Sequence, residues 1–179
     1  PALIDAIYQH PNYTVFILST LITSMVGFIL LLSVWGKQQQ LGLREAFLLT
    51  TSTWVAIAIF SSIPFYMSDL SLNFTDAFFE SMSGITTTGA TVINNLEIQS
   101  KGVLIWRALL QWLGGIGIIV MAVAVLPMLQ VGGMQLFRLE SSDNADKILP
   151  RATQIAGSLV LLYLIITFIC ALSYNIAGM

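Results

Sequence analysis

Four long runs without a charged residue constrain this chain more than any other feature. They are Thr14–Trp35, Ala46–Met67, Ala108–Phe137 and Ala152–Met179. An α-helix needs about 20 mostly apolar residues to cross the ~30 Å hydrocarbon core of a membrane, and each run reaches that length. Only 9% of the 179 residues are charged, whereas charged residues make up roughly a quarter of a soluble domain. The sequence therefore predicts an all-α integral membrane protein with four transmembrane helices.

Basic residues orient these helices in the membrane. Two of the seven, Lys101 and Arg107, precede the third run, and the other five flank the loops 37–44 and 138–151. Because lysine and arginine concentrate on the cytoplasmic side, both loops are predicted to be cytoplasmic. The N-terminal segment YQHPNY would then lie outside, where His10 is expected to be a solvated loop residue. Three aromatic residues near the ends of the runs suit an interfacial belt: Trp35, Tyr66 and Trp106.

The third run is longer than a straight span requires. It contains Pro127 and several glycines, which favour a tilt, a kink or a break near the segment VGGMQ. Gly114, Gly115 and Gly117 allow another helix to approach closely, and a hinge is the alternative role for them.

The segment between the second and third runs starts and finishes on the same side, yet it is too apolar for an aqueous loop. Thr75 is predicted to be a helix N-cap, with Asp76 in the first turn. DAFFESMSG then gives a helix of roughly 14 Å, which ends near the middle of the membrane. Gly84 is predicted to stop this helix. We therefore expect a re-entrant half-helix.

The stretch TTTGATV after the half-helix can return to the outside, since seven extended residues span about 20 Å. Non-helical backbone at membrane depth occurs only where it is buried in protein or lines a water-filled cavity. The negative C-terminal end of the half-helix favours a cation, and Gly89 can adopt a positive φ that turns a carbonyl. These features predict an extended strand of a cation selectivity filter. A Thr/Gly-rich turn between helices is the alternative.

Two long segments, FTDAFFESMSGITTTGATV and RALLQWLGGIGIIVMAVAVLPMLQVGGMQLFRLE, resemble the Trk/Ktr/HKT superfamily of potassium transporters. The resemblance is greatest to the bacterial TrkH-type potassium uptake subunit, continues through DKILPR, and covers about residues 40–179. In this family one polypeptide carries four helix–pore-loop–helix repeats around a central pore, and each repeat gives one strand of the filter.

The resemblance implies a division of the chain into four parts. Residues 1–43 hold the end of an extra N-terminal hairpin and a cytoplasmic loop, and 44–137 form the first repeat. Residues 138–151 are a cytoplasmic linker, and 152–179 begin the second repeat. We therefore expect a piece of a longer protein that supplies one filter strand, Thr86–Val92, and does not conduct alone.

The resemblance also implies which groups bind the ion. They are the backbone carbonyls of Thr86, Thr87, Thr88, Gly89 and Ala90. A K⁺ site would lie at Thr87 and Thr88. The filter has a single glycine, so strict discrimination of K⁺ from Na⁺ is not implied. K⁺ is expected as the transported ion, with no cofactor.

Glu80 and Arg107 are the most deeply placed charges on the outer side. Charges at membrane depth usually pair or face water. We hypothesise that these two contact each other and, together with Gly84, support the pore loop. In the alternative, both side chains extend to the interface and stay apart.

The expected role is potassium uptake across the bacterial inner membrane. The resemblance implies a homodimer and a cytosolic nucleotide-binding regulatory subunit, which residues 141–147 could contact. A subunit of a homotetrameric cation channel and a non-conducting packing subunit are the alternatives. A formal net charge of −2 does not point to nucleic acid. The sequence shows no constellation of nucleophile, base and acid, so no enzymatic activity is expected.

Overall fold

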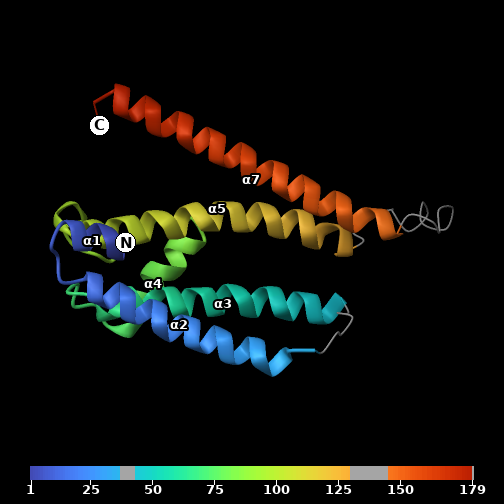
Figure 1. Cartoon of the computed structure of the whole chain (residues 1–179), viewed down its shortest axis with the longest axis horizontal. Helices are drawn as coiled ribbons and strands as arrows, with labels where there is room; N and C mark the ends of the chain where they lie inside the picture. The colour runs from blue at the N-terminus through green and yellow to red at the C-terminus, as the bar shows by residue number, and fades with distance from the viewer. Residues whose placement is uncertain (37–42, 130–144, 179) are drawn as a thin grey trace. The chain divides into compact units, whose positions relative to one another are not determined.

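The computed structural model describes residues 1–36, 43–129 and 145–178 (Figure 1). Every regular element in these residues is a helix, and they contain no β-strand. The chain forms two compact units, Pro1–Gly115 and Ile116–Met179, which are described separately below.

The first unit holds the half-helix. Its elements are α1 (Ala2–Ile7), α2 (Tyr13–Val34), α3 (Leu43–Met67), α4 (Phe74–Ile85), η1 (Leu96–Ile98) and the first part of α5 (Lys101–Leu129). The short helix α4 lies between α3 and α5 in Figure 1, and α3 packs against both α2 and α4. The expected half-helix is therefore present, enclosed by two long helices.

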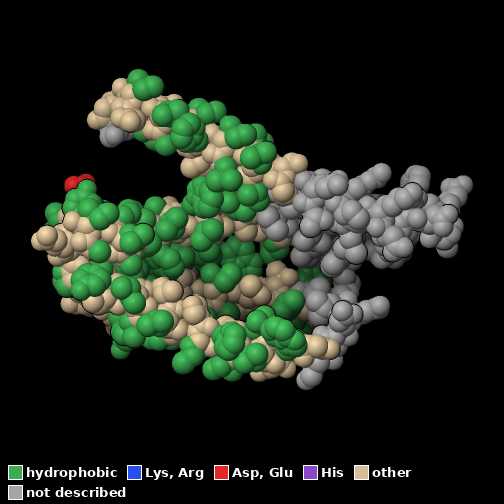
Figure 2. Space-filling view, viewed as in Figure 1, with side chains coloured by type: hydrophobic (Ala, Val, Ile, Leu, Met, Phe, Trp, Pro, Cys, Tyr) green, Lys and Arg blue, Asp and Glu red, His purple; other side chains and the backbone are tan. Residues whose placement is uncertain are grey.

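The second unit contains the rest of α5 and the helix α7 (Ala145–Ile176). None of the residues in the most apolar part of α7, Gly157–Ile176, is buried. The single cysteine, Cys170, is exposed on this helix. Hydrophobic side chains are spread along the described helices on the face shown in Figure 2.

Four described helices are long and apolar enough to cross a membrane. They are Tyr13–Val34, Phe47–Met67, Lys101–Ile119 and Gly157–Ile176. The predicted number is confirmed, but the third helix begins at Lys101 and not at Ala108. The prediction began after Arg107 because a charge usually ends an apolar run, whereas here the arginine lies within the helix.

Three predictions fall partly or wholly on residues outside the described ones. They are the cytoplasmic loops at 37–44 and 138–151, the break at VGGMQ, and a contact of residues 141–147 with a regulatory subunit. The four-part division of the chain also stays a prediction. The boundary between the two compact units lies within α5, between Gly115 and Ile116.

The core of the first unit surrounds the half-helix. It consists of Phe16, Phe65, Ala77, Ile85, Ile93, Val103 and Leu110. Trp106 packs against this core, with its ring edge-on to Phe16, and donates a hydrogen bond from Nε1 to the carbonyl of Ser61 (3.0 Å). Its indole N–H therefore has a partner on α3, and its place in an interfacial belt stays a prediction.

Candidate cation-filter site

The half-helix α4 begins at a polar cap. Asn73 is the N-cap, and its side-chain oxygen accepts a hydrogen bond from the backbone N–H of Asp76 (2.9 Å). This bond satisfies one of the N–H groups that have no partner inside a helix. The predicted cap at Thr75 is therefore wrong, because Asn73 already occupies that role and the helix starts at Phe74. Asp76 lies in the first turn, as predicted.

The end of α4 also differs from the prediction. The helix runs to Ile85, and the residue with left-handed backbone is Thr87 (φ 58°), so Gly84 is not the stop. Gly84 is buried, and a Cβ there would lie 3.1 Å from the Cβ of Leu110 on α5. Its small size lets α4 and α5 pack closely.

Ser83 organises the turn that follows the helix. Its carbonyl accepts hydrogen bonds from the N–H groups of Thr88 (3.0 Å) and Gly89 (3.3 Å). Its hydroxyl donates to the carbonyl of Ala90 (2.6 Å). Gly89 has φ 79°, which confirms the predicted positive φ. The stretch therefore begins with a turn around the C-terminal end of α4, and it has no regular secondary structure up to Ile93.

Glu80 holds the returning part of the loop. Its side chain is completely buried. One carboxylate oxygen, Oε2, accepts hydrogen bonds from the hydroxyl of Thr91 and the N–H of Val92, both at 3.0 Å. The other, Oε1, accepts from Nε of Arg107 (2.5 Å). A single carboxylate on α4 is thus bonded to both the loop and α5.

Arg107 completes this connection from α5. Its Nη2 donates to the carbonyls of Gly89 (2.8 Å) and Ala90 (3.3 Å). The side chain is 14% exposed, and that of Glu80 is not exposed at all. The hypothesised contact between the two residues is present, and the alternative in which both extend apart to the interface is wrong. Since each partner also binds the loop, the pair ties α4, α5 and the loop together.

The five carbonyls predicted to bind K⁺ have different surroundings. In the described part of the chain, no group donates a hydrogen bond to the carbonyls of Thr86, Thr87 or Thr88. The carbonyl of Gly89 accepts one hydrogen bond and that of Ala90 accepts two. A carbonyl oxygen has two lone pairs, so Ala90 is the least available ligand. Ion binding at all five positions stays a prediction, and the geometry favours the three threonines.

Three of the residues that shape this site did not stand out in the sequence: Asn73, Ser83 and Thr91. Asn73 carried a usable signal, because asparagine three residues before an acidic first turn is a common N-cap. Ser83 and Thr91 carried none, since their partners are set by the path of the loop.

Replacement of Ser83 with alanine tests its role in the turn. We expect this variant to lower the free energy of unfolding by about 1 kcal/mol, the usual contribution of one intramolecular hydrogen bond. The measurement is the thermal unfolding of the purified protein in detergent. Ser33→Ala is the matched control, because the Ser33 hydroxyl donates to the carbonyl of Ile29 within its own helix, at an exposed position. Equal unfolding temperatures for the two variants would count against an organising role for Ser83.

These features define a class of protein: a multi-pass membrane protein with a re-entrant half-helix and a braced pore loop. A family model described as TrkH, cation transport protein, matches residues 12–178. The chain therefore belongs to the TrkH family of cation transport proteins, which confirms the resemblance seen in the sequence.

Relatives with assigned names support the same family. The potassium uptake protein TrkI of Halomonas elongata is 41% identical over the whole chain, and TrkH of Escherichia coli K12 is 40% identical. The chain spans 36% and 38% of their lengths. The crystal structure of the potassium transporter TrkH from Vibrio parahaemolyticus matches the whole chain with a TM-score of 0.85 at 36% identity, and the chain covers 36% of it. The chain thus spans little more than a third of these relatives.

Proposed function

We propose that this chain takes part in potassium uptake across the bacterial inner membrane and supplies one of four filter strands. Its relatives are named potassium uptake proteins and are much longer than this chain. That difference in length agrees with three further strands from the rest of a longer polypeptide. Transport of K⁺, without a cofactor and without catalysis, is the inferred activity.

The observation that carries this proposal is that some carbonyls of the loop have a hydrogen-bond donor and others have none. The carbonyls of Thr86, Thr87 and Thr88 have no hydrogen-bond donor among the described residues, whereas Gly89 and Ala90 are held by Arg107. A cation filter needs carbonyl oxygens that can replace water around an ion. It also needs a fixed backbone, which the braced residues supply.

Replacement of Gly89 with alanine is expected to reduce K⁺ uptake by the complete transporter. An L-residue with a positive φ costs about 1–2 kcal/mol, and each ~1.4 kcal/mol is a factor of ten in an equilibrium. We therefore expect roughly tenfold lower uptake or a weaker preference for K⁺ over Na⁺. Ion uptake in cells that lack their own K⁺ uptake systems is the measurement.

Gly36→Ala is the matched control for this variant. Gly36 has a similar φ of 83° and nothing within 4 Å of an added Cβ, but it lies beyond the end of α2 and not in the loop. Unchanged transport by Gly89→Ala would mean that the loop is only a turn. Uptake of K⁺ by cells that express residues 1–179 alone would instead support a homotetrameric channel.

We also propose a homodimer and a cytosolic nucleotide-binding regulatory subunit as partners. The support for both is the family resemblance. Copurification of the complete transporter with a nucleotide-binding protein, and its mass in detergent, are the measurements that check them.

A further inference from the structure

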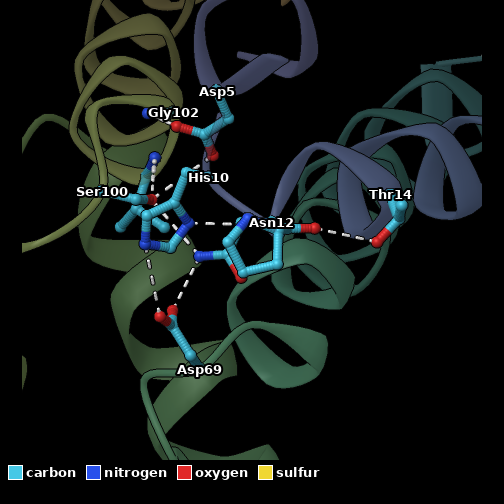
Figure 3. A network of polar contacts seen from close by, with 9 residues as sticks. Asp5, His10, Asn12, Thr14, Asp69, Ser100 and Gly102 are labelled. Carbon is cyan, nitrogen blue, oxygen red and sulfur yellow. Dashed lines mark hydrogen bonds and ion pairs between the residues drawn. The ribbon is translucent and has the colours of Figure 1, made fainter. Parts of the chain in front are cut away.

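The N-terminal segment folds onto the start of α5. Asp5, on α1, is completely buried. Its Oδ1 accepts a hydrogen bond from the N–H of Gly102 (2.6 Å), and its Oδ2 accepts one from the hydroxyl of Ser100 (3.4 Å) (Figure 3). The first N–H groups of a helix have no partner within it, and a negative charge is favoured there. Asp5 therefore caps α5 from a different helix.

Gly102 makes this cap possible. A Cβ at position 102 would overlap the carboxylate of Asp5. Any other residue at this position would therefore push the Asp5 carboxylate away and break its hydrogen bond to the backbone N–H of residue 102. This close approach makes Gly102→Ala a second way to remove the cap without changing the carboxylate.

A second group of contacts joins the same segment to Asp69, two residues after the end of α3. Asn12 donates from Nδ2 to Oδ1 of Asp69 (2.7 Å) and to the hydroxyl of Ser100 (3.3 Å). His10 lies with Nε2 3.7 Å from Oδ2 of Asp69 and accepts a hydrogen bond from the N–H of Asn12 at Nδ1 (3.4 Å). His10 lies in a loop, as expected, and its side chain is 34% exposed, so it contacts Asp69 while it still faces solvent.

We propose that Asp5 is a positioning residue for the filter and acts through Arg107. Arg107 follows Gly102 on the same helix by about 7.5 Å of rise, and it holds the carbonyls of Gly89 and Ala90. A fixed first turn of α5 sets the height and rotation of the guanidinium relative to these carbonyls. This inference rests on the proposed function, since its consequence is a change in ion preference.

The first test compares K⁺ and Na⁺ uptake by the complete transporter with Asp5→Ala and Asp5→Asn. We expect Asp5→Ala to lower the K⁺/Na⁺ uptake ratio by about three- to tenfold, the size expected when one helix cap is lost. Asp5→Asn keeps an oxygen that can accept from the N–H of Gly102, so it should restore most of the ratio. Glu97→Ala is the control, because Glu97 is an exposed carboxylate on η1 and should leave the ratio unchanged.

The second test asks whether the effect passes through Arg107. In an Arg107→Lys transporter, where the bridging guanidinium is absent, Asp5→Ala should change the ratio no further. Gly102→Ala, with Arg107 and Asp5 both retained, should reproduce the loss seen with Asp5→Ala. Because the ratio is taken within one preparation, it does not depend on how much protein reaches the membrane.

The possible results distinguish failure of the positioning role of Asp5 from failure of the proposed potassium uptake. A lower amount of protein with an unchanged ratio, in Asp5→Ala or in Gly102→Ala, would overturn the positioning role and leave Asp5 a structural cap. If Asp5→Ala lowered the ratio equally in the transporter that keeps Arg107 and in the Arg107→Lys transporter, the positioning role would also be overturned. Absence of K⁺ uptake by the unsubstituted transporter would count against the proposed function itself.

Discussion

Replacement of Arg107 with alanine is expected to destabilise the protein by about 3–5 kcal/mol, the usual cost of removing one partner of a buried ion pair. The reason is that Glu80 is completely buried and its carboxylate would lose the guanidinium that pairs with it. The same change removes the donor to the carbonyls of Gly89 and Ala90. We therefore expect a large loss of folded protein and, in what remains, a weaker preference for K⁺.

Two further variants separate the effect of the unpaired Glu80 carboxylate from the effect of the lost donor to the loop carbonyls. Glu80→Gln should destabilise less, because the guanidinium is partly exposed and can still reach water and the loop carbonyls. The double variant Glu80→Gln with Arg107→Gln should be more stable than Arg107→Ala, because it buries no unpaired charge. Thermal unfolding in detergent and K⁺ and Na⁺ uptake are the measurements.

Lys101→Gln is the matched control for the loss of a positive charge on α5. Lys101 is exposed at the first residue of this helix, so its replacement should change neither stability nor uptake by much. An Arg107→Ala protein that unfolds at the temperature of the Lys101→Gln protein would contradict the bracing role. Unchanged ion preference in Arg107→Ala would show that the loop holds its shape without the guanidinium.

The membrane helices and the Glu80–Arg107 pair were predictable from the sequence because both follow from the cost of placing charge or free backbone in lipid. Long uncharged runs leave few alternatives to helices. Charges at membrane depth usually pair or face water, so a contact between Glu80 and Arg107 was one of two interpretations of the sequence, and it is the one that the structure shows. The loop was predictable from the number and order of the long runs, because an apolar segment whose two ends lie on the same side of a membrane must turn back within it.

The bonds that fix the details of the site were not predictable in this way. Ser83 bonds the loop because the chain turns at Thr87, and that turn is visible only in the folded path. Asp5 meets Gly102 across 97 positions of sequence. A short helix before the first long run gives a weak pattern, so α1 was missed, and with it the cap that Asp5 provides to α5. Such contacts depend on how distant segments meet, and no local pattern encodes them.

Replacement of Gly114 with alanine is expected to disturb the end of the half-helix strongly, because the added methyl group would meet backbone. A Cβ at this position would overlap the backbone carbonyl of Ile85, the last residue of α4. Backbone cannot rotate away as a flexible side chain can, so α4 and α5 must separate. Overpacking of a core costs about 1–3 kcal/mol and occasionally more, and we expect the upper end here. The carbonyls of Thr86–Thr88 follow directly after Ile85, so K⁺ uptake should also fall steeply.

Gly27→Ala gives the matched control, because Gly27 lies within α2 and has open space where a Cβ would be. Alanine favours a helix over glycine by about 1 kcal/mol, so this variant should be as stable as the unsubstituted protein or slightly more stable. The two variants add the same methyl group to the same kind of backbone, and they differ only in what that methyl group meets. Thermal unfolding and K⁺ uptake should therefore separate them clearly. If Gly114→Ala matched Gly27→Ala in both measurements, close contact between α5 and the end of the half-helix would not be what holds the filter loop in place.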